Sequence, residues 1–223
     1  MGSGILLLAS CSGDLSALDP AGPSAGSIAH LWWVMLAGSI LLFLLVVGLF
    51  LATVFVPRFG RSISPRNWII GGGIFLPLPI LLALTFYALW QGEYLLRGGG
   101  GFPLQSPLRV EAHGTMWQWR FSYPDIRGAT PTSGTLHIPT GRTVEIRVSS
   151  SDVIHSFWVP RLAGKIDAIP GHTNYLRLRA DRPGRYGGVC SEYCGTGHAG
   201  MRFVVQAHTQ EDYLAALAEE GGR

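Results

Sequence analysis

The sequence carries little charge and little cysteine. Only 14% of its 223 residues are Asp, Glu, Lys or Arg and 48% are hydrophobic, a composition too apolar for a purely soluble protein. The formal net charge is only +3, and the chain has no basic run or nucleic-acid-binding motif, so nucleic acid is not an expected partner. The three cysteines are Cys11, Cys190 and Cys194, so Cys11 stands apart and needs its own explanation.

Two long stretches contain no Asp, Glu, Lys or Arg at all. They run from Ile28 to Val56 and from Trp68 to Trp90, and each exceeds the roughly 20 apolar residues that cross a bilayer. The loop between them, residues 57–67, holds three arginines and no acid. Because such loops stay in the cytoplasm, the sequence predicts a transmembrane hairpin over residues 28–97, with loop 57–67 cytoplasmic and both termini outside.

The N-terminus lacks the basic residues of an ordinary export signal. Residues 1–11 are nevertheless apolar, and Leu8-Ala-Ser-Cys11 resembles a bacterial lipobox, whose cysteine is lipidated and becomes the new N-terminus. A lipid on Cys11 would lie on the outer side, in agreement with the topology predicted from the arginines; the alternative is an unremarkable apolar N-terminus. Residues 12–27 are small and polar and predict a flexible tether, so residues 1–27 form a signal-like segment plus tether.

Beyond a Gly-rich linker at residues 98–107 the hydrophobic pattern changes to a period of two. Apolar and polar residues alternate at 143–148 and at 176–179, with Pro and Gly between such runs. This pattern predicts an all-β sandwich or barrel over residues 108–208. The chain closes with a predicted C-terminal helix and tail, residues 209–223, with Thr209 as the candidate N-cap.

Soft metal ligands gather in residues 190–201, Cys-Ser-Glu-Tyr-Cys-Gly-Thr-Gly-His-Ala-Gly-Met. The glycines disfavour a helix and favour a folded loop that carries Cys190, Cys194, His198 and Met201. A disulfide would leave the imidazole and the thioether unexplained, and a Cys2His2 zinc site would leave the thioether idle. Thiolate, imidazole and thioether together favour copper, with the disulfide and zinc as open alternatives.

A further candidate ligand is His155, which lies 35 residues before Cys190. His155 followed by Cys-x-Glu-x-Cys-x3-His-x2-Met resembles the binuclear copper A site of cytochrome c oxidase subunit II. The similarity extends to Lys165–Gly171 and to the Trp117-x-Trp119 pair, and covers most of the chain from about residue 28 to 208. It implies a cupredoxin-like Greek-key barrel for the β region.

In that family two thiolates bridge two copper ions, each of which takes one imidazole and one weak ligand. The resemblance therefore implies that the copper ligands are His155, Cys190, the carbonyl of Glu192, Cys194, His198 and Met201. It also implies that the Glu192 carboxylate holds magnesium or manganese at the contact with subunit I, and a carboxylate suits such hard cations.

The resemblance also points to the route of the electron. It implies that electrons arrive at Trp117, although spacing alone would make this residue a core aromatic. Asp152 precedes a copper ligand by three residues, so we expect it to lie near the outer edge of the centre. We therefore predict Asp152 among the few acidic contacts with the electron donor.

The resemblance implies subunit II of a bacterial haem–copper oxidase, in the inner (cell) membrane, with its copper domain on the periplasmic side. It implies electron transfer from a c-type cytochrome to haem in subunit I, where oxygen is reduced to water and protons are translocated, in a complex with other oxidase subunits. The alternatives are a membrane-anchored copper carrier, another copper A protein, or a quinol oxidase subunit II without copper ligands.

Two departures from the family pattern matter. Residues 65–73 carry no carboxylate, although family members often have a glutamate near the start of the second helix, at a proton channel. From Gln91 onward the chain holds 14 Lys and Arg against 12 Asp and Glu, so an acidic docking face for a basic cytochrome c is less obvious than the family pattern leads one to expect.

Overall fold

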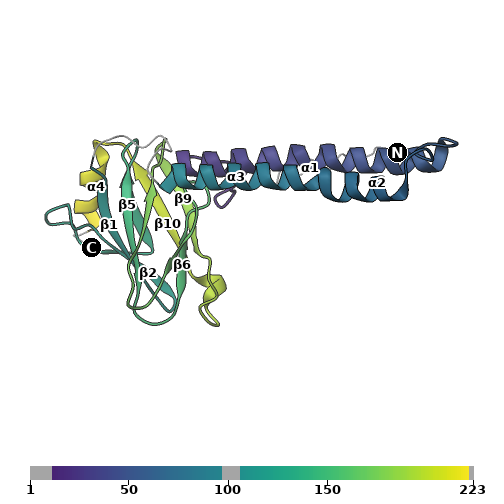
Figure 1. The fold of residues 1–223 in the computed structure, drawn as a ribbon. Coiled ribbons are helices and arrows are strands. Elements are labelled where there is room, and N and C mark those ends of the chain that lie inside the picture. The colour runs from purple at the N-terminus through teal and green to yellow at the C-terminus, as the bar shows by residue number, and fades with distance from the viewer. Residues whose placement is uncertain (1–11, 97–105, 221–223) are drawn as a thin grey trace, which may run out of the picture. The chain divides into compact units, whose positions relative to one another are not determined.

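The computed structural model describes residues 12–96 and 106–220 (Figure 1). The predicted lipidation site Cys11 and the glycines of the predicted linker, Gly98–Gly101, lie outside the described residues. The chain divides into a β unit, made of residues 1–29 and 98–223, and a helical unit, residues 30–97. Among the described residues, those before and after the helical unit belong to the same unit, so the helical unit is an insertion in the sequence of the β unit.

Two long apolar helical runs lie between residues 23 and 96. The first is α1 (Pro23–Phe55), and the second joins α2 (Pro65–Ile70), the π-helix η1 (Gly71–Phe75) and α3 (Pro77–Leu96). Ser64 caps the second run, because its hydroxyl accepts a hydrogen bond from the Asn67 N–H and Pro65 occupies the first turn. Two segments, Pro23–Phe55 and Pro65–Glu93, are long and apolar enough to cross a membrane.

Both helical runs begin earlier than the uncharged stretches predict. α1 starts at Pro23 rather than Ile28, and the second run starts at Pro65 rather than Trp68. Small residues and a single arginine are compatible with a helix that has a good cap, so charge alone places these starts too late. The three consecutive glycines continue the second run as a π-helix and do not break it.

The β unit contains ten strands among the described residues. They are β1 (Leu108–Thr115), β2 (Gln118–Ser122), β3 (Thr132–Ser133), β4 (Thr135–Pro139), β5 (Val144–Ser150), β6 (His155–Trp158), β7 (Ile166–Ala168), β8 (Asn174–Leu178), β9 (Gly184–Cys190) and β10 (Arg202–His208). They form two five-stranded sheets with the orders β3-β2-β1-β5-β8 and β4-β10-β9-β6-β7. The pairs β1·β5 and β4·β10 are parallel, and the others are antiparallel.

The core lies between the two sheets and is rich in aromatic rings. Trp119, Phe121 and Phe157 are fully buried, and Phe203 is 3% exposed. The rings of Phe157 and Phe203 stack with centroids 4.7 Å apart, at the distance typical of favourable aromatic pairs. A Cβ at Gly188 would lie 2.3 Å from the Phe203 ring, so only glycine lets β9 pass this close. The predicted fold class, an apolar helical hairpin with an all-β cupredoxin-like domain, is confirmed.

The segment that precedes α1 packs against the β unit. The carboxylate of Asp19 lies 2.7 Å from the Arg161 guanidinium, and the Ala21 N–H donates to the Arg161 carbonyl at 2.7 Å. The Asp181 N–H in turn donates to the Ala21 carbonyl at 2.9 Å. Composition predicts a flexible tether for residues 12–27, whereas in the structure this part of it is hydrogen-bonded to the β unit.

The chain closes with α4 (Asp212–Glu220), which packs on the β unit through Tyr213 and Leu217, both buried. The Thr209 hydroxyl accepts a hydrogen bond from the Asp212 N–H at 3.2 Å, as expected of an N-cap side chain. The helix begins three residues after the predicted cap.

Candidate metal centre

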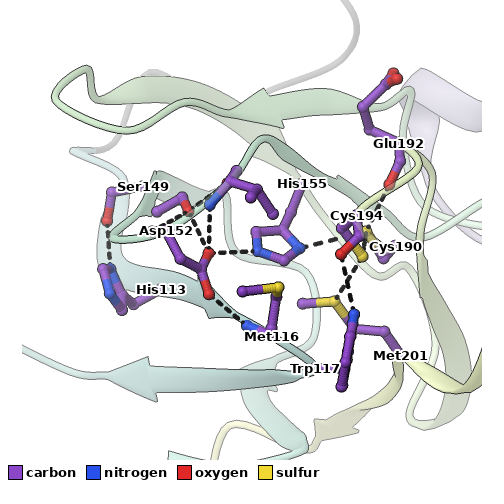
Figure 2. A network of polar contacts seen from close by, with 12 residues as sticks. His113, Met116, Trp117, Ser149, Asp152, His155, Cys190, Glu192, Cys194 and Met201 are labelled. Atoms are coloured by element: carbon purple, nitrogen blue, oxygen red, sulfur yellow. Dashed lines mark hydrogen bonds and ion pairs between the residues drawn. The ribbon is translucent and has the colours of Figure 1, made fainter. Parts of the chain in front are cut away.

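Three of the predicted ligands, His155, Cys190 and Met201, lie where strands of the second sheet begin or end, at one end of that sheet (Figure 2). His155 is the first residue of β6, Cys190 is the last of β9, and Met201 immediately precedes β10. Backbone hydrogen bonds fix these ends: the Cys190 N–H donates to the Met201 carbonyl, and the Ser191 N–H donates to the Ser156 carbonyl. The rigid sheet therefore holds a loop rich in glycine, which composition alone would leave mobile.

The two thiols lie side by side in the interior. Cys190 Sγ is 3.8 Å from Cys194 Sγ, and the side chains are 5% and 3% exposed. A disulfide requires sulfur atoms about 2.05 Å apart, and both cysteines are free. Burial raises the pKa of the Cys194 thiol to about 11, and the neighbouring Cys190 adds to the rise. Metal binding at these thiols therefore displaces protons.

Each thiol also has its own set of nearby donor atoms. His155 Nδ1 lies 3.8 Å from Cys190 Sγ, and the Glu192 carbonyl accepts a hydrogen bond from that thiol at 3.3 Å. His198 Nδ1 and Met201 Sδ lie 3.6 Å and 3.7 Å from Cys194 Sγ. All six ligand groups predicted from the sequence are thus brought together.

The donor set fits copper better than the other metals considered. The ligand atoms of His155, Cys190 and Cys194 lie within 4.8 Å of one another. His155 is fully buried and Met201 is 1% exposed, so water has little access to them. A tetrahedral zinc site has four strong ligands and no use for a thioether or a carbonyl, whereas soft sulfur with imidazole suits copper.

Asp152 holds His155 in place from the side away from the thiols (Figure 2). Its Oδ1 accepts hydrogen bonds from His155 Nε2 at 2.8 Å and from the Ser150 hydroxyl at 3.1 Å, while Oδ2 accepts from the Met116 N–H at 2.7 Å. With Nε2 donating, Nδ1 of His155 keeps its lone pair toward the thiols. Burial alone would raise the pKa of Asp152, but these hydrogen bonds outweigh it and hold that pKa well below its usual range.

The geometry of Asp152 adds a second role to the one predicted from the sequence. Asp152 is predicted to offer a charge to a docking partner, and its side chain is 24% exposed, but its carboxylate oxygens also accept hydrogen bonds from His155, Ser150 and Met116. The backbone groups that donate hydrogen bonds to the Asp152 carboxylate belong to Met116, in the turn before β2, and to Val153, the residue that follows Asp152. Asp152 therefore acts on the centre through the orientation of His155.

We expect Asp152→Asn to weaken copper binding by about 10- to 100-fold, the usual cost of removing a partner that orients a ligand. The amide keeps the size of the side chain but replaces one acceptor oxygen with a donor, which conflicts with the backbone N–H groups. Copper affinity would be measured by competition with a chelator, and the absorption bands of the centre would shift. Asp167→Asn, which removes an exposed carboxylate 3.7 Å from Lys165, is the control and should change neither. Equal affinities in both variants would contradict this role.

Trp117 touches the centre directly although it is 42% exposed. Its indole Nε1–H donates a hydrogen bond to the Cys194 carbonyl at 3.0 Å. A Cβ at Gly197 would lie 2.3 Å from the indole ring, so the ring lies flat against this loop only because residue 197 is glycine. Trp117 precedes β2 and does not share the buried face of Trp119 and Phe121.

Glu192 points its carboxylate away from the thiols. One oxygen lies 3.8 Å from Lys165 Nζ, and both side chains are about half exposed. Sequence reasoning missed Lys165 as a partner of Glu192, because the two residues lie in different segments of the chain. It also missed Ser150 as a partner of Asp152, although the two are only two residues apart. The match of Lys165–Gly171 to the family was the only signal for the first.

Comparisons with known proteins agree with this geometry. Residues 129–208 match the family described as "Cytochrome C oxidase subunit II, periplasmic domain". Cytochrome c oxidase subunit 2 of Synechocystis sp. is 43% identical over 108 residues, which are 48% of this chain and 32% of that protein. The same subunit of Alkalihalophilus pseudofirmus is 30% identical over 226 residues, 94% of this chain and 64% of that protein.

Relatives named for a different electron donor match as well. Quinol oxidase subunit 2 of Bacillus spizizenii is 30% identical over 220 residues, covering 94% of this chain and 67% of that protein. The matched part of the chain spans about a third of the length of the Synechocystis protein and about two thirds of the length of the Alkalihalophilus and Bacillus proteins. These similarities agree with the fold and with the cluster of thiols and imidazoles at one end of the second sheet. The chain therefore belongs to the cytochrome c oxidase subunit II family.

Proposed function

We propose that this chain is the copper A subunit of a haem–copper oxidase. The observation that carries the proposal is the pair of buried free thiols, whose sulfur atoms are 3.8 Å apart. Each thiol has one imidazole and one weak donor next to it. Two bridging thiolates require that spacing to be short and the thiols to be free. Cys190 and Cys194 would bridge two copper ions, with His155, His198, Met201 and the Glu192 carbonyl as the remaining ligands.

Copper at this site would accept and release one electron at a time. The protein's part is to hold the ligands still and keep water out, since rearrangement of ligands or water during electron transfer lowers the rate of that transfer. Backbone hydrogen bonds at the ends of β9 and β10 fix Cys190 and Met201, and the hydrogen bond from His155 to Asp152 fixes His155. Burial of these side chains excludes water. Trp117 offers a contact that reaches from solvent to the backbone of a thiol ligand.

The physiological reaction proposed is electron transfer from a c-type cytochrome to haem in subunit I. Oxygen reduction and proton translocation would occur in that subunit, within a complex that includes other oxidase subunits. Membership of the family and the relatives named cytochrome c oxidase subunit 2 support this role. The two apolar helices support a membrane-anchored protein.

A quinol oxidase subunit is the main rival, because relatives of that name match almost the whole chain. The donor set argues against it, since a subunit without copper has no need for two thiols, two imidazoles and a thioether around one point. A copper carrier is disfavoured by burial, because a carrier must exchange its metal and His155 is fully enclosed.

Copper binding tests the proposal directly. The full chain, solubilised in detergent and reduced beforehand, should bind two copper ions and show the purple colour and mixed-valence EPR signal of two metals that share one electron. Metal analysis and EPR on the same sample give the ratio and the signal. One zinc per chain, or one copper with the signal of an isolated ion, would overturn the proposal.

Glu192 is also proposed to bind magnesium or manganese at the contact with subunit I. The carboxylate is half exposed and faces away from the thiols, and its only ion-pair partner among the described residues is Lys165 at 3.8 Å. Oxygen ligands suit such cations. A lysine partner is readily displaced when a divalent ion and a second subunit supply better contacts.

The membrane topology is a proposal with its own test. Three arginines, Arg58 and Arg61 in the connection between the two helical runs and Arg66 in the first turn of α2, support a cytoplasmic position for this connection and a periplasmic one for the β unit. A reporter active only in the cytoplasm should function when inserted at Gly60 and fail at the C-terminus. The reverse pattern would refute the topology. Mass spectrometry of the mature chain decides separately whether Cys11 is lipidated.

A further inference from the structure

An apolar patch surrounds the point where Trp117 reaches the surface. Its members, which we call the metal-end patch, are 37% to 75% exposed: Met116, Trp117, Val153, Ile154 and Tyr193. They come from three loops that are tied together, because Met116 bonds to Asp152 and Trp117 bonds to the Cys194 carbonyl. The ring of Tyr193 lies 5.8 Å from that of His198. Under the proposed function this patch is where an electron-donor protein sits.

The acids of residues 106–208, a range that excludes the segment before α1 and the helix α4, are almost all engaged by the protein itself. Residues 106–208 contain seven Asp and Glu. Six of them have an ion pair or several hydrogen bonds within the described residues, namely Asp125, Glu145, Asp152, Asp167, Asp181 and Glu192. Asp152 and Glu192, the two acids closest to the centre, are both in this set. Both carboxylates at the metal end are therefore already paired with other residues of this chain.

The arginines show the opposite pattern. Residues 106–208 contain twelve Lys and Arg, an excess of five positive charges over the acids. Five of the twelve have ion pairs, and the other seven form none with a described residue: Arg120, Arg127, Arg142, Arg147, Arg182, Arg185 and Arg202. Arg120 follows Trp117 by three residues on β2, and Arg202 directly follows the ligand Met201. Free positive charge thus flanks the patch from both sheets.

Arg120 and Arg147 share a hollow on the outer face of the first sheet. Its volume is about 430 Å³, and it is lined by Glu111, His113, Arg120, Ser122, Arg147, Ser149, Thr173 and Tyr175. Strand register places Arg120 opposite His113 and Arg147 opposite Glu111, so two arginines face a single acid. The Nε–H of Arg147 is enclosed and has no hydrogen-bond partner, although its guanidinium lies over the Tyr175 ring. A carboxylate that enters the hollow can accept two parallel hydrogen bonds from a guanidinium.

We propose that the electron donor of this chain is a protein with an acidic docking surface. Its apolar centre would cover the metal-end patch, and its carboxylates would pair with Arg120, Arg147 and Arg202 around the rim. The donor loses one electron and the centre gains it, so the step needs no further reactant. This inference rests on the proposed function and adds the sign of the donor's charge.

The test compares two forms of one donor. A basic mitochondrial-type cytochrome c is used as such, and again after its lysines are succinylated, which reverses its charge but keeps the haem. Stopped-flow reduction of the copper-loaded full chain is followed at low salt, where screening is weak. We expect the succinylated form to be faster by about tenfold or more, the scale of electrostatic steering, and to slow as salt rises. Equal rates, or a faster basic form, would overturn the inference.

Matched variants locate the effect on the surface. Arg120→Gln and Arg147→Gln should each slow the acidic donor and leave the basic one unslowed, with unchanged copper spectra. Arg127→Gln is the control, because Arg127 is also exposed and unpaired but lies beyond the far end of β2. An equal loss in the control would place docking elsewhere. Reduction by dithionite tests the proposed function separately from the charge of the donor. If dithionite fails to reduce the centre, the proposed electron-transfer function is refuted. If dithionite reduces it, the comparison of the two donor forms decides the charge of the donor.

Discussion

Under the proposed function, replacement of either Cys190 or Cys194 should abolish the binuclear copper centre. In Cys190→Ser and in Cys194→Ser a hard hydroxyl replaces a soft thiolate, so the purple colour and the mixed-valence EPR signal are both expected to disappear. Because each sulfur lies within 3.8 Å of the other and of an imidazole nitrogen, loss of one removes a ligand from both metals. Metal analysis should find at most one copper per chain.

Cys11→Ser provides the control for thiol removal. Cys11 is distant in sequence from the loop at residues 190–201, and its replacement should leave the copper count and the EPR signal intact. Oxygen consumption by the assembled oxidase should fall to the background level in the two loop variants only. If Cys190→Ser or Cys194→Ser kept the mixed-valence signal, bridging thiolates would be disproved.

Trp117→Ala is expected to slow electron arrival by about 30-fold or more and to leave the copper spectrum unchanged. A central exposed tryptophan at a docking site typically contributes ~2 kcal/mol or more, which corresponds to that factor. The substitution also removes the hydrogen bond from Nε1 to the Cys194 carbonyl. Stopped-flow reduction of the copper-loaded chain by its cytochrome measures the rate.

Two companion variants separate contact from hydrogen bond. Trp117→Phe keeps an aromatic ring over Gly197 but lacks the N–H donor, so its rate should fall between those of the wild type and Trp117→Ala. Met116→Ala trims the same patch without touching the Cys194 carbonyl and should have a smaller effect. A normal rate in Trp117→Ala would mean that the electron arrives elsewhere and that the indole only packs on the loop.

The ligand set could be predicted because most of it is local in the chain. Four candidate side-chain ligands and the Glu192 carbonyl lie within twelve residues, and His155 lies in one distant motif. The chemical softness of the sulfur ligands is a property of the residues themselves. The strand pattern was equally informative, since Val144, Ile146 and Val148 are all buried as the alternation predicts.

The contacts that tune the site could not be predicted in this way. The position of Asp152 depends on the turn before β2, 36 residues away, which presents the Met116 N–H to it. Trp117 shares its sequence period with Trp119, but β2 begins one residue later, so the two rings face different surroundings. Periodicity specifies the face of a residue only within a strand, and both cases lie at the ends of strands.

The packed segment before α1 has a consequence for the order of folding. Asp19 and Arg161 are 142 positions apart, so their contact closes a very large loop that contains the whole helical insertion. Loop closure of this length is slow, and during synthesis residue 19 emerges long before residue 161. Under the proposed topology both must also reach the periplasm before they meet. The contact between the segment before α1 and Arg161 would therefore form only after the hairpin has inserted and residues up to 161 have crossed the membrane.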